Sequence, residues 1–230
     1  MKEQYKCQRS SEQASFVDSV FTVFSQGYLV NSIQKIVEKS SFLVYVTEVG
    51  CFNARLMNFL LQRKLINIKY TGIDVRQDYL DQSELKNHDD VVLLCKDVVN
   101  DHLERYKSQD IVVCSEVIEH LSPEDLEPAL KKMISMIKPG GTLITSFPMN
   151  SSTFEFHTVG NEKDLGHVNF PDHLEYSQLV ESCGMTFIEY DSGFCIRSNY
   201  EIPYSIYTSF EYVKILEMLG ERVALAYAMT

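Results

Sequence analysis

The sequence predicts an α/β fold, with a doubly wound and mostly parallel sheet that has helices on both faces. Short runs rich in Val, Leu and Ile alternate along the chain with longer segments whose apolar residues recur at helical spacing. The short runs show little apolar-polar alternation, which is typical of strands buried on both faces. The 230 residues are 45% hydrophobic and 23% charged, as in ordinary globular proteins, so we expect a single domain over 1–230.

The first half of the chain is expected to supply two helices and then three strands. Phe16–Phe24 and Leu29–Lys39 have the pattern of amphipathic helices. The elements expected next are a strand over Val44–Val46 that leads into the turn Glu48-Val49-Gly50, a helix over Asn53–Lys64, a strand over Tyr70–Val75, a weaker helix over Gln77–Leu85 and a strand over Val91–Cys95.

The second half begins with a strand over Asp110–Cys114 and a helix with a clear start. In Ser122-Pro123-Glu124-Asp125, serine is a good N-cap, proline suits the first helical position, and the acids favour the positive end of the dipole. This helix is expected to end at Lys138-Pro139-Gly140-Gly141. The remaining expectations are a strand over Thr142–Phe147, a long loop over 148–170, a helix over Leu174–Ser182, a strand over Thr186–Tyr190, a helix over Tyr204–Leu219 and an edge strand over Arg222–Ala228.

Charge and composition exclude several classes of protein. Lys and Arg number 21 against 32 Asp and Glu, a net charge of −11, which argues against duplex nucleic acid as the main partner. The six cysteines form no Cys-x-x-Cys pair, as expected of free thiols in a reducing compartment. No apolar run approaches about 18 residues, so we expect no membrane span. Residues 1–12 lack the apolar core of a signal peptide, and we expect a cytoplasmic location.

Three strand ends carry residues suited to a ligand with a ribose and a purine. Ligands of open α/β sheets bind at the carboxyl ends of the strands, and Gly50 would let the backbone approach such a ligand closely. Asp74, roughly 20 residues further on, can accept hydrogen bonds from two ribose hydroxyls. Asp97 can accept a hydrogen bond from a purine amine, while Val98 packs against the ring. Each acid taken alone is more often a solvated loop or helix-cap residue than a ligand-binding one, since acids are common in turns.

A resemblance to a known family is carried by six segments in order: Glu48-Val49-Gly50, Gly72-Ile73-Asp74, Lys96-Asp97-Val98, Asp110–Leu121, Lys138–Leu143 and Gly166–Phe170. Together they resemble class I S-adenosylmethionine-dependent methyltransferases, over roughly residues 40 to 190. The resemblance implies a Rossmann-like, seven-stranded, mostly parallel sheet that ends in an antiparallel hairpin. It also implies the following parts of one methyltransferase domain: an N-terminal helical lid over 1–40, a substrate loop over 148–170, and a C-terminal helix and edge strand over 191–230.

The resemblance further implies a binding site for S-adenosylmethionine. The expected cofactor-binding residues are Glu48, Gly50 and Cys51 after the first strand, Asp74 and Val75 after the second, Asp97 and Val98 after the third, and Ser115 and Glu116 after the fourth. Asp74 would hold the ribose hydroxyls and Asp97 the adenine amine. The sequence departs from the family at Phe52 and Ala54, where glycines are usual. The Phe52 side chain is therefore expected to crowd the cofactor or to force another path of the loop.

The expected reaction is methyl transfer from S-adenosylmethionine to oxygen or nitrogen of a small molecule, such as a metabolite, a sugar or a lipid-linked precursor, with S-adenosylhomocysteine as product. A hydroxyl acceptor must lose a proton, and imidazole titrates near neutrality. We therefore expect His120, His167 and Glu116 to be the catalytic residues. We expect no resident metal. The oligomeric state stays open, with a homodimer as the candidate.

Two other functions stay open at this point. Phe52 favours a catalytically silent, methyltransferase-like subunit that binds a partner protein. The spacing Glu116-x-x-Glu119-His120 resembles that of small-RNA 2′-O-methyltransferases, in which it holds a divalent ion together with a later histidine. His167 or His173 would supply that later histidine here. The same spacing also resembles that of ubiquinone-type small-molecule O-methyltransferases.

Overall fold

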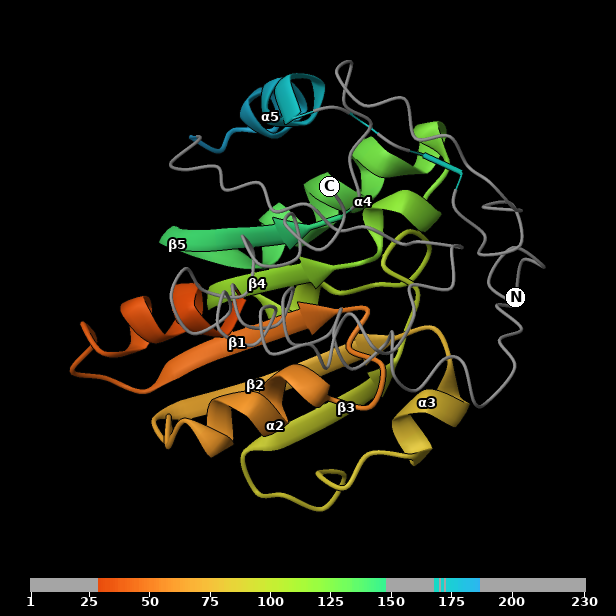
Figure 1. Cartoon of the computed structure of the whole chain (residues 1–230). Helices are drawn as coiled ribbons and strands as arrows, with labels where there is room; N and C mark the ends of the chain where they lie inside the picture. Colours follow the sequence, from red (N-terminus) through yellow and green to blue (C-terminus); the bar gives the residue numbers. More distant parts are fainter. Residues whose placement is uncertain (1–28, 148–167, 170, 172, 187–230) are drawn as a thin grey trace, which may run out of the picture.

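The computed structural model describes residues 29–147, 168–169, 171 and 173–186, and Figure 1 shows a central sheet between helices. Residues 29–37 are helical. The elements that follow are β1 (Val44–Val49), α2 (Arg55–Gln62), β2 (Ile68–Asp74), α3 (Gln77–Asp81), β3 (Val91–Cys95), the 3₁₀ turn η2 (Glu104–Tyr106), β4 (Gln109–Ser115), the 3₁₀ turn η3 (Ile118–His120), α4 (Pro123–Met136), β5 (Ile137–Ser146) and α5 (His173–Ser182).

The described strands form one parallel sheet in the order β3-β2-β1-β4-β5. The chain runs outward from β1 to β3 and then returns to place β4 on the other side of β1. The strand order therefore switches between β1 and β4, where open α/β sheets bind ligands. The predicted doubly wound, parallel sheet is confirmed for five strands. Of the strand predicted over Thr186–Tyr190, only Thr186 is among the described residues. The sixth and seventh strands therefore stay predictions.

Each face of the sheet is covered by its own apolar cluster. One cluster joins Val44 and Val46 of β1 to α2 and to the helix over residues 29–37. The other joins Val49 of β1 to α4 and to Tyr176 of α5. Alternate residues of β1 thus face opposite layers, and this explains the apolar runs without polar alternation that predicted the fold.

The start of α4 follows the prediction from its sequence. Ser122 Oγ accepts a hydrogen bond from the Asp125 backbone N–H at 3.2 Å, Pro123 occupies the first turn, and Glu124 lies in the same turn. The cap satisfies a backbone donor that has no partner within the helix, and the acids lie at its positive end. The helix begins where its signals place it because those signals are local.

Among the element boundaries that differ from the prediction, two differ by four residues or more. Helix α3 ends at Asp81 rather than at Leu85, because the Ser83 hydroxyl accepts the Leu85 N–H and so stabilises a turn instead of the helix. Strand β5 begins at Ile137 rather than at Thr142. Gln109 pairs with Ile137 and Ile111 with Thr142, so residues 138–141 bulge out of the strand that they had been expected to precede.

Several predicted segments lie outside the described residues. They are the helix Phe16–Phe24, most of the loop 148–170, the helix Tyr204–Leu219 and the edge strand Arg222–Ala228. The division into a lid over 1–40, a substrate loop and a C-terminal part over 191–230 stays a prediction. Within the described ranges, no helix is long and apolar enough to cross a membrane.

Candidate functional site

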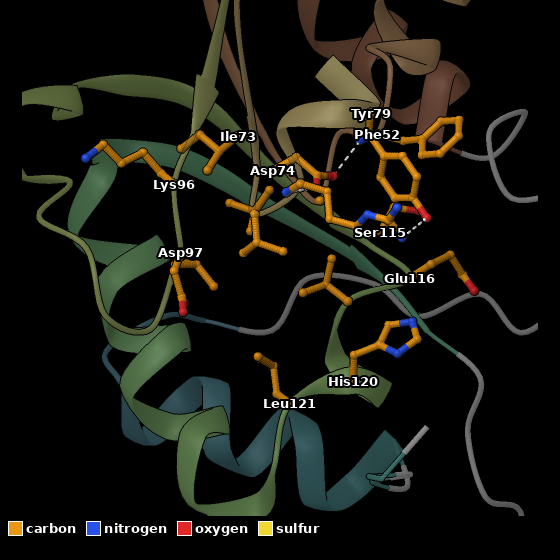
Figure 2. Close-up of a pocket in the computed structure, with 16 residues that line it drawn as sticks. Phe52, Ile73, Asp74, Tyr79, Lys96, Asp97, Ser115, Glu116, His120 and Leu121 are labelled. Atoms are coloured by element: carbon orange, nitrogen blue, oxygen red, sulfur yellow. Dashed lines mark hydrogen bonds between the residues drawn. The ribbon is translucent and has the colours of Figure 1, made fainter. Parts of the chain in front are cut away.

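A cavity of about 300 Å³ opens at the carboxyl ends of β1, β2, β3 and β4, where the strand order switches. Its volume falls at the lower end of the range for small-molecule sites. Figure 2 shows Phe52 and Tyr79 together on one side of the cavity and His120 with Leu121 on the opposite side. Most of the lining residues come from the segments that directly follow these strands.

The turn after β1 contains three alternating residues with left-handed backbone. Their φ angles are 78° at Gly50, 53° at Phe52 and 63° at Ala54. A Cβ atom at Gly50 would lie 2.1 Å from Val117 Cγ2, so only glycine fits there. A left-handed φ costs other residue types about 1 kcal/mol. Phe52 and Ala54 thus adopt the conformation of the glycines that the resemblance leads one to expect.

The Phe52 ring forms part of the cavity wall. It packs against the Tyr79 ring of α3 with the centroids 4.3 Å apart and the planes at 60°, and both residues line the cavity. Edge-to-face pairs of this kind are favourable. The Phe52 backbone N–H donates to Asp74 Oδ2 at 2.9 Å. The cavity persists beside the ring, which lies against α3.

Asp74 holds the turns after β1 and β2 together from the edge of the cavity. Its Oδ2 accepts the Phe52 N–H and its Oδ1 accepts the Arg76 N–H, both at 2.9 Å. The residue is 8% exposed and lines the cavity next to Val75. Burial raises the pKa of Asp74, while the two backbone donors act in the opposite direction. Arg76, which the sequence analysis did not single out, also lines the cavity.

Glu48 and Cys51 lie in the core rather than in the cavity wall. The Glu48 carboxylate accepts a hydrogen bond from the Tyr70 hydroxyl, and burial raises its pKa to about 8. Cys51 is 2% exposed, and its Sγ lies 2.7 Å from where a Cβ on Gly72 would be. Burial raises the pKa of the Cys51 thiol well above its ordinary value. The cofactor contacts expected of Glu48 and Cys51 stay predictions.

The turn after β3 is held by carboxylates. Asp97 Oδ1 accepts the backbone N–H groups of Val99 and Asn100, and its Oδ2 accepts the Asn100 side-chain amide at 2.7 Å. The Asp97 N–H in turn donates to Asp101 Oδ2 at 2.8 Å. Asp97 and the 5% exposed Val98 both line the cavity, as expected, together with Lys96.

The turn after β4 places a third acid at the cavity, besides Asp74 and Asp97. Glu116 lines the cavity with a left-handed φ of 55°, and its N–H donates to the Ser146 carbonyl of β5 at 2.8 Å. The Ser146 hydroxyl lies 2.8 Å from Ser115 Oγ and donates to Glu116 Oε1 at 3.3 Å. Sequence reasoning missed Ser146 because its pairing partner is 31 residues away. The available signal was that Ser146 lies near the end of the strand expected over Thr142–Phe147, and this strand could be expected to pair with the one that ends near Ser115.

The Glu116-x-x-Glu119-His120 spacing is split by the fold. His120 of η3 lines the cavity with Glu116, whereas the Glu119 side chain is fully buried and does not line it. The Glu119 carbonyl accepts the N–H groups of Val168 and Asn169, which ties that segment to η3. His167 lies outside the described residues. Among the described residues, no three His, Cys, Asp or Glu side chains lie where they could share a metal ion.

Comparison with known proteins agrees with this architecture. Residues 47–143 match a protein family described as "Methyltransferase domain", which covers β1 to β5. No curated protein matches the sequence. Similar solved structures share its fold at low sequence identity.

Three examples have TM-scores between 0.53 and 0.60. The apo form of SibL, an S-adenosylmethionine-dependent methyltransferase, is 18% identical over 72% of this chain, with a TM-score of 0.53, and the chain spans only 50% of SibL. Magnesium protoporphyrin IX methyltransferase from Synechocystis PCC 6803, with bound SAM, is 15% identical over 81% of this chain and 79% of its own, with a TM-score of 0.55.

The third is a chain from the complex of the Haloferax volcanii Trm112 methyltransferase activator with a methyltransferase. It is 16% identical over 96% of this chain and 93% of its own, with a TM-score of 0.60. Residues 47–143 therefore resemble a methyltransferase domain, and the chain shares the Rossmann-like fold of these solved methyltransferase structures.

Proposed function

We propose that the chain binds S-adenosylmethionine in the cavity at the carboxyl ends of β1 to β4 and transfers its methyl group to oxygen or nitrogen of a small molecule. One observation carries the proposal: the left-handed turn over residues 50–54 closes onto the Asp74 carboxylate at the switch in strand order. A turn of this kind brings backbone close to a ligand, with an acid beside it.

The donors and acceptors at the cavity suit the parts of this cofactor. Each Asp74 oxygen accepts one backbone N–H and keeps capacity for a further bond, so the carboxylate can receive two ribose hydroxyls. Asp97 Oδ2 accepts one amide and keeps capacity for an adenine amine. Val98 offers the apolar surface against which a purine ring packs. Glu116 supplies a carboxylate next to the place expected for the methionine part of the cofactor.

The bound cofactor would supply a methyl group already activated on a sulfonium. The protein then has to orient the acceptor and exclude water. Val117 and Leu121 line the cavity with apolar side chains that favour a dry site. His120, on the wall opposite Phe52, is the described imidazole placed to accept a proton from a hydroxyl acceptor. The roles expected of His167 and Glu116 in proton removal stay predictions.

Calorimetric titration with S-adenosylmethionine and S-adenosylhomocysteine tests the proposal. We expect the wild-type protein to bind both ligands. Asp74→Asn should weaken binding by about tenfold or more, since a buried site loses a charged acceptor. Asp90→Asn is the matched control, because Asp90 pairs with Lys69 on the surface and does not line the cavity. We expect it to bind like the wild type.

The contrary result is equally clear. Absence of heat and of any rise in melting temperature with both ligands at millimolar concentration would overturn cofactor binding. It would favour the catalytically silent, partner-binding alternative. The metal-dependent RNA alternative has less support, because the Glu119 side chain that it needs at the ion is fully buried and does not line the cavity with Glu116 and His120.

A further inference from the structure

The turn after β3 is braced from outside by a lysine that does not line the cavity. Lys132 of α4 donates from its Nζ to the carbonyls of Val99 and Asp101, each at 2.8 Å. Both carbonyls belong to the segment over residues 96–101, and its first three residues line the cavity. The ammonium therefore holds the far side of the wall at which an adenine would bind.

A backbone hydrogen bond ties the start of the segment to β2, from the Lys96 N–H to the Asp74 carbonyl at 2.9 Å. Asp97 and Asp101 bond mostly within it: the Asp101 N–H donates to the Asp97 carbonyl, and Lys96 lies 3.7 Å from Asp101. These bonds shape the turn but do not fix its position against the sheet. Val98 packs with α4 residues in one apolar cluster, and such packing is not directional. The two bonds from Lys132 fix the direction of the later part of the segment, at Val99 and Asp101.

We propose that Lys132 is a positioning residue for cofactor binding, which orients the 96–101 segment so that Asp97 and Val98 meet the adenine. This inference rests on the proposed function. The Asp97 carboxylate accepts three hydrogen bonds within the turn. The orientation of the turn therefore sets the direction in which the carboxylate can accept a further bond. A small rotation of the segment would turn both the free acceptor position of Asp97 and the apolar side chain of Val98 away from the adenine.

Helix α4 offers a matched control one residue away. Lys131 has the same side chain on the same helix, but its Nζ pairs with Glu127 Oε1 at 2.7 Å on the exposed face. Lys132→Met removes both bonds to the turn and keeps the aliphatic stem. Lys131→Met removes only a surface ion pair of small energetic value. Lys132→Arg keeps a cation with several donors and tests rescue.

The experiment measures the Kd for S-adenosylhomocysteine at a temperature at which every variant is folded, and amide hydrogen exchange of residues 97–101 without ligand. We expect Lys132→Met to raise the Kd about tenfold and to speed exchange in this segment. Lys132→Arg should restore the Kd to within about threefold of the wild type, and Lys131→Met should change neither quantity. Lys132→Gln, which can still donate to one carbonyl, replaces the methionine variant if that variant does not fold.

A folded Lys132→Met protein with wild-type affinity overturns the inference, even if its melting temperature falls, because a purely structural lysine gives that pattern. If the wild type itself binds no S-adenosylhomocysteine, the proposed function fails and the binding role of Lys132 fails with it. Hydrogen exchange separates the two cases, since it reports whether Lys132 holds the segment in the absence of any ligand.

Discussion

The turns after β1 and β3 bound the same cavity but keep their shapes by different means. Over residues 50–54 the backbone itself adopts left-handed φ angles at alternate residues, and the Gly50 and Cys51 N–H groups donate to the Ile73 carbonyl at 2.8 and 3.1 Å. Over residues 96–101 no residue has a positive φ, and side chains of Asp97, Asp101 and Lys132 make the bonds.

The difference decides what each turn tolerates. A turn made by backbone conformation depends on which residues can adopt that conformation and on the space above them, as at Gly50. A turn made by side-chain hydrogen bonds depends on keeping each donor and acceptor, including a donor on a helix far along the chain. The first turn is therefore sensitive to added atoms and the second to removed charges.

The largest effect is expected for Gly50→Ala. The added methyl group would meet Val117 Cγ2, and alanine would be held at a φ of 78°. Strain and overpacking together should lower the free energy of unfolding by about 3 kcal/mol, measured by urea denaturation. Gly140→Ala is the control, since Gly140 has the same φ with nothing within 4 Å, and should cost about 1 kcal/mol. Equal losses at both positions would contradict the steric account.

The next effect concerns pH, because the pKa values of a core acid in β1 and of an acid in the turn after β3 shift in opposite directions. Burial raises the pKa of Glu48 to about 8, whereas the Asp97 N–H lowers the pKa of Asp101. The folded protein therefore holds a proton on Glu48 that the unfolded chain releases from about pH 4.5 upward. The stability that Glu48 contributes is complete below that pH and is lost as the pH rises to about 8, at no more than roughly 1.4 kcal/mol per pH unit.

Asp101 acts at the acid end. Its contribution is present above its ordinary pKa and is lost as the pH falls through its lowered pKa. Glu48→Gln should flatten the unfolding free energy between about pH 5 and 8, and Asp101→Asn should change only the acid limb. Glu127→Gln, an exposed acid on α4, serves as the control. An unchanged slope in Glu48→Gln would show that the Glu48 carboxylate is not the group that titrates.

The smallest effect is expected for Phe52→Gly. Glycine relieves the left-handed strain of about 1 kcal/mol but loses the edge-to-face contact with Tyr79, which is of similar size. The free energy of unfolding should change by less than about 1 kcal/mol. Ala54→Gly, which relieves strain at the other non-glycine position without removing a ring, is the comparison. A loss above about 2 kcal/mol in Phe52→Gly would show that the ring is part of the core.

Local signals predicted much of the fold. The start of α4 was predicted because its cap, proline and acids all act within one turn. The apolar strands were predicted because a strand buried on both faces gives a continuous apolar run, which can be recognised in a short stretch of sequence. The start of β5 was not predicted, since residues 138–141 look like a helix end, and only pairing with β4 makes them a bulge. The end of α3 depended on one serine hydroxyl bond.

The sequence by itself determined the order of strands and helices and the presence of acids at the ends of β2 and β3, because hydrophobic spacing and turn residues act locally. Only the tertiary structure decided which acids of the chain line the cavity. It placed Asp74 and Asp97 at the wall and Glu48 and Glu119 in the core, and it brought Ser146 and Lys132 to turns far away in the chain. The physical reason is that burial and hydrogen-bond partners are set by which strands lie side by side, and the sheet order fixes that only after the chain has folded.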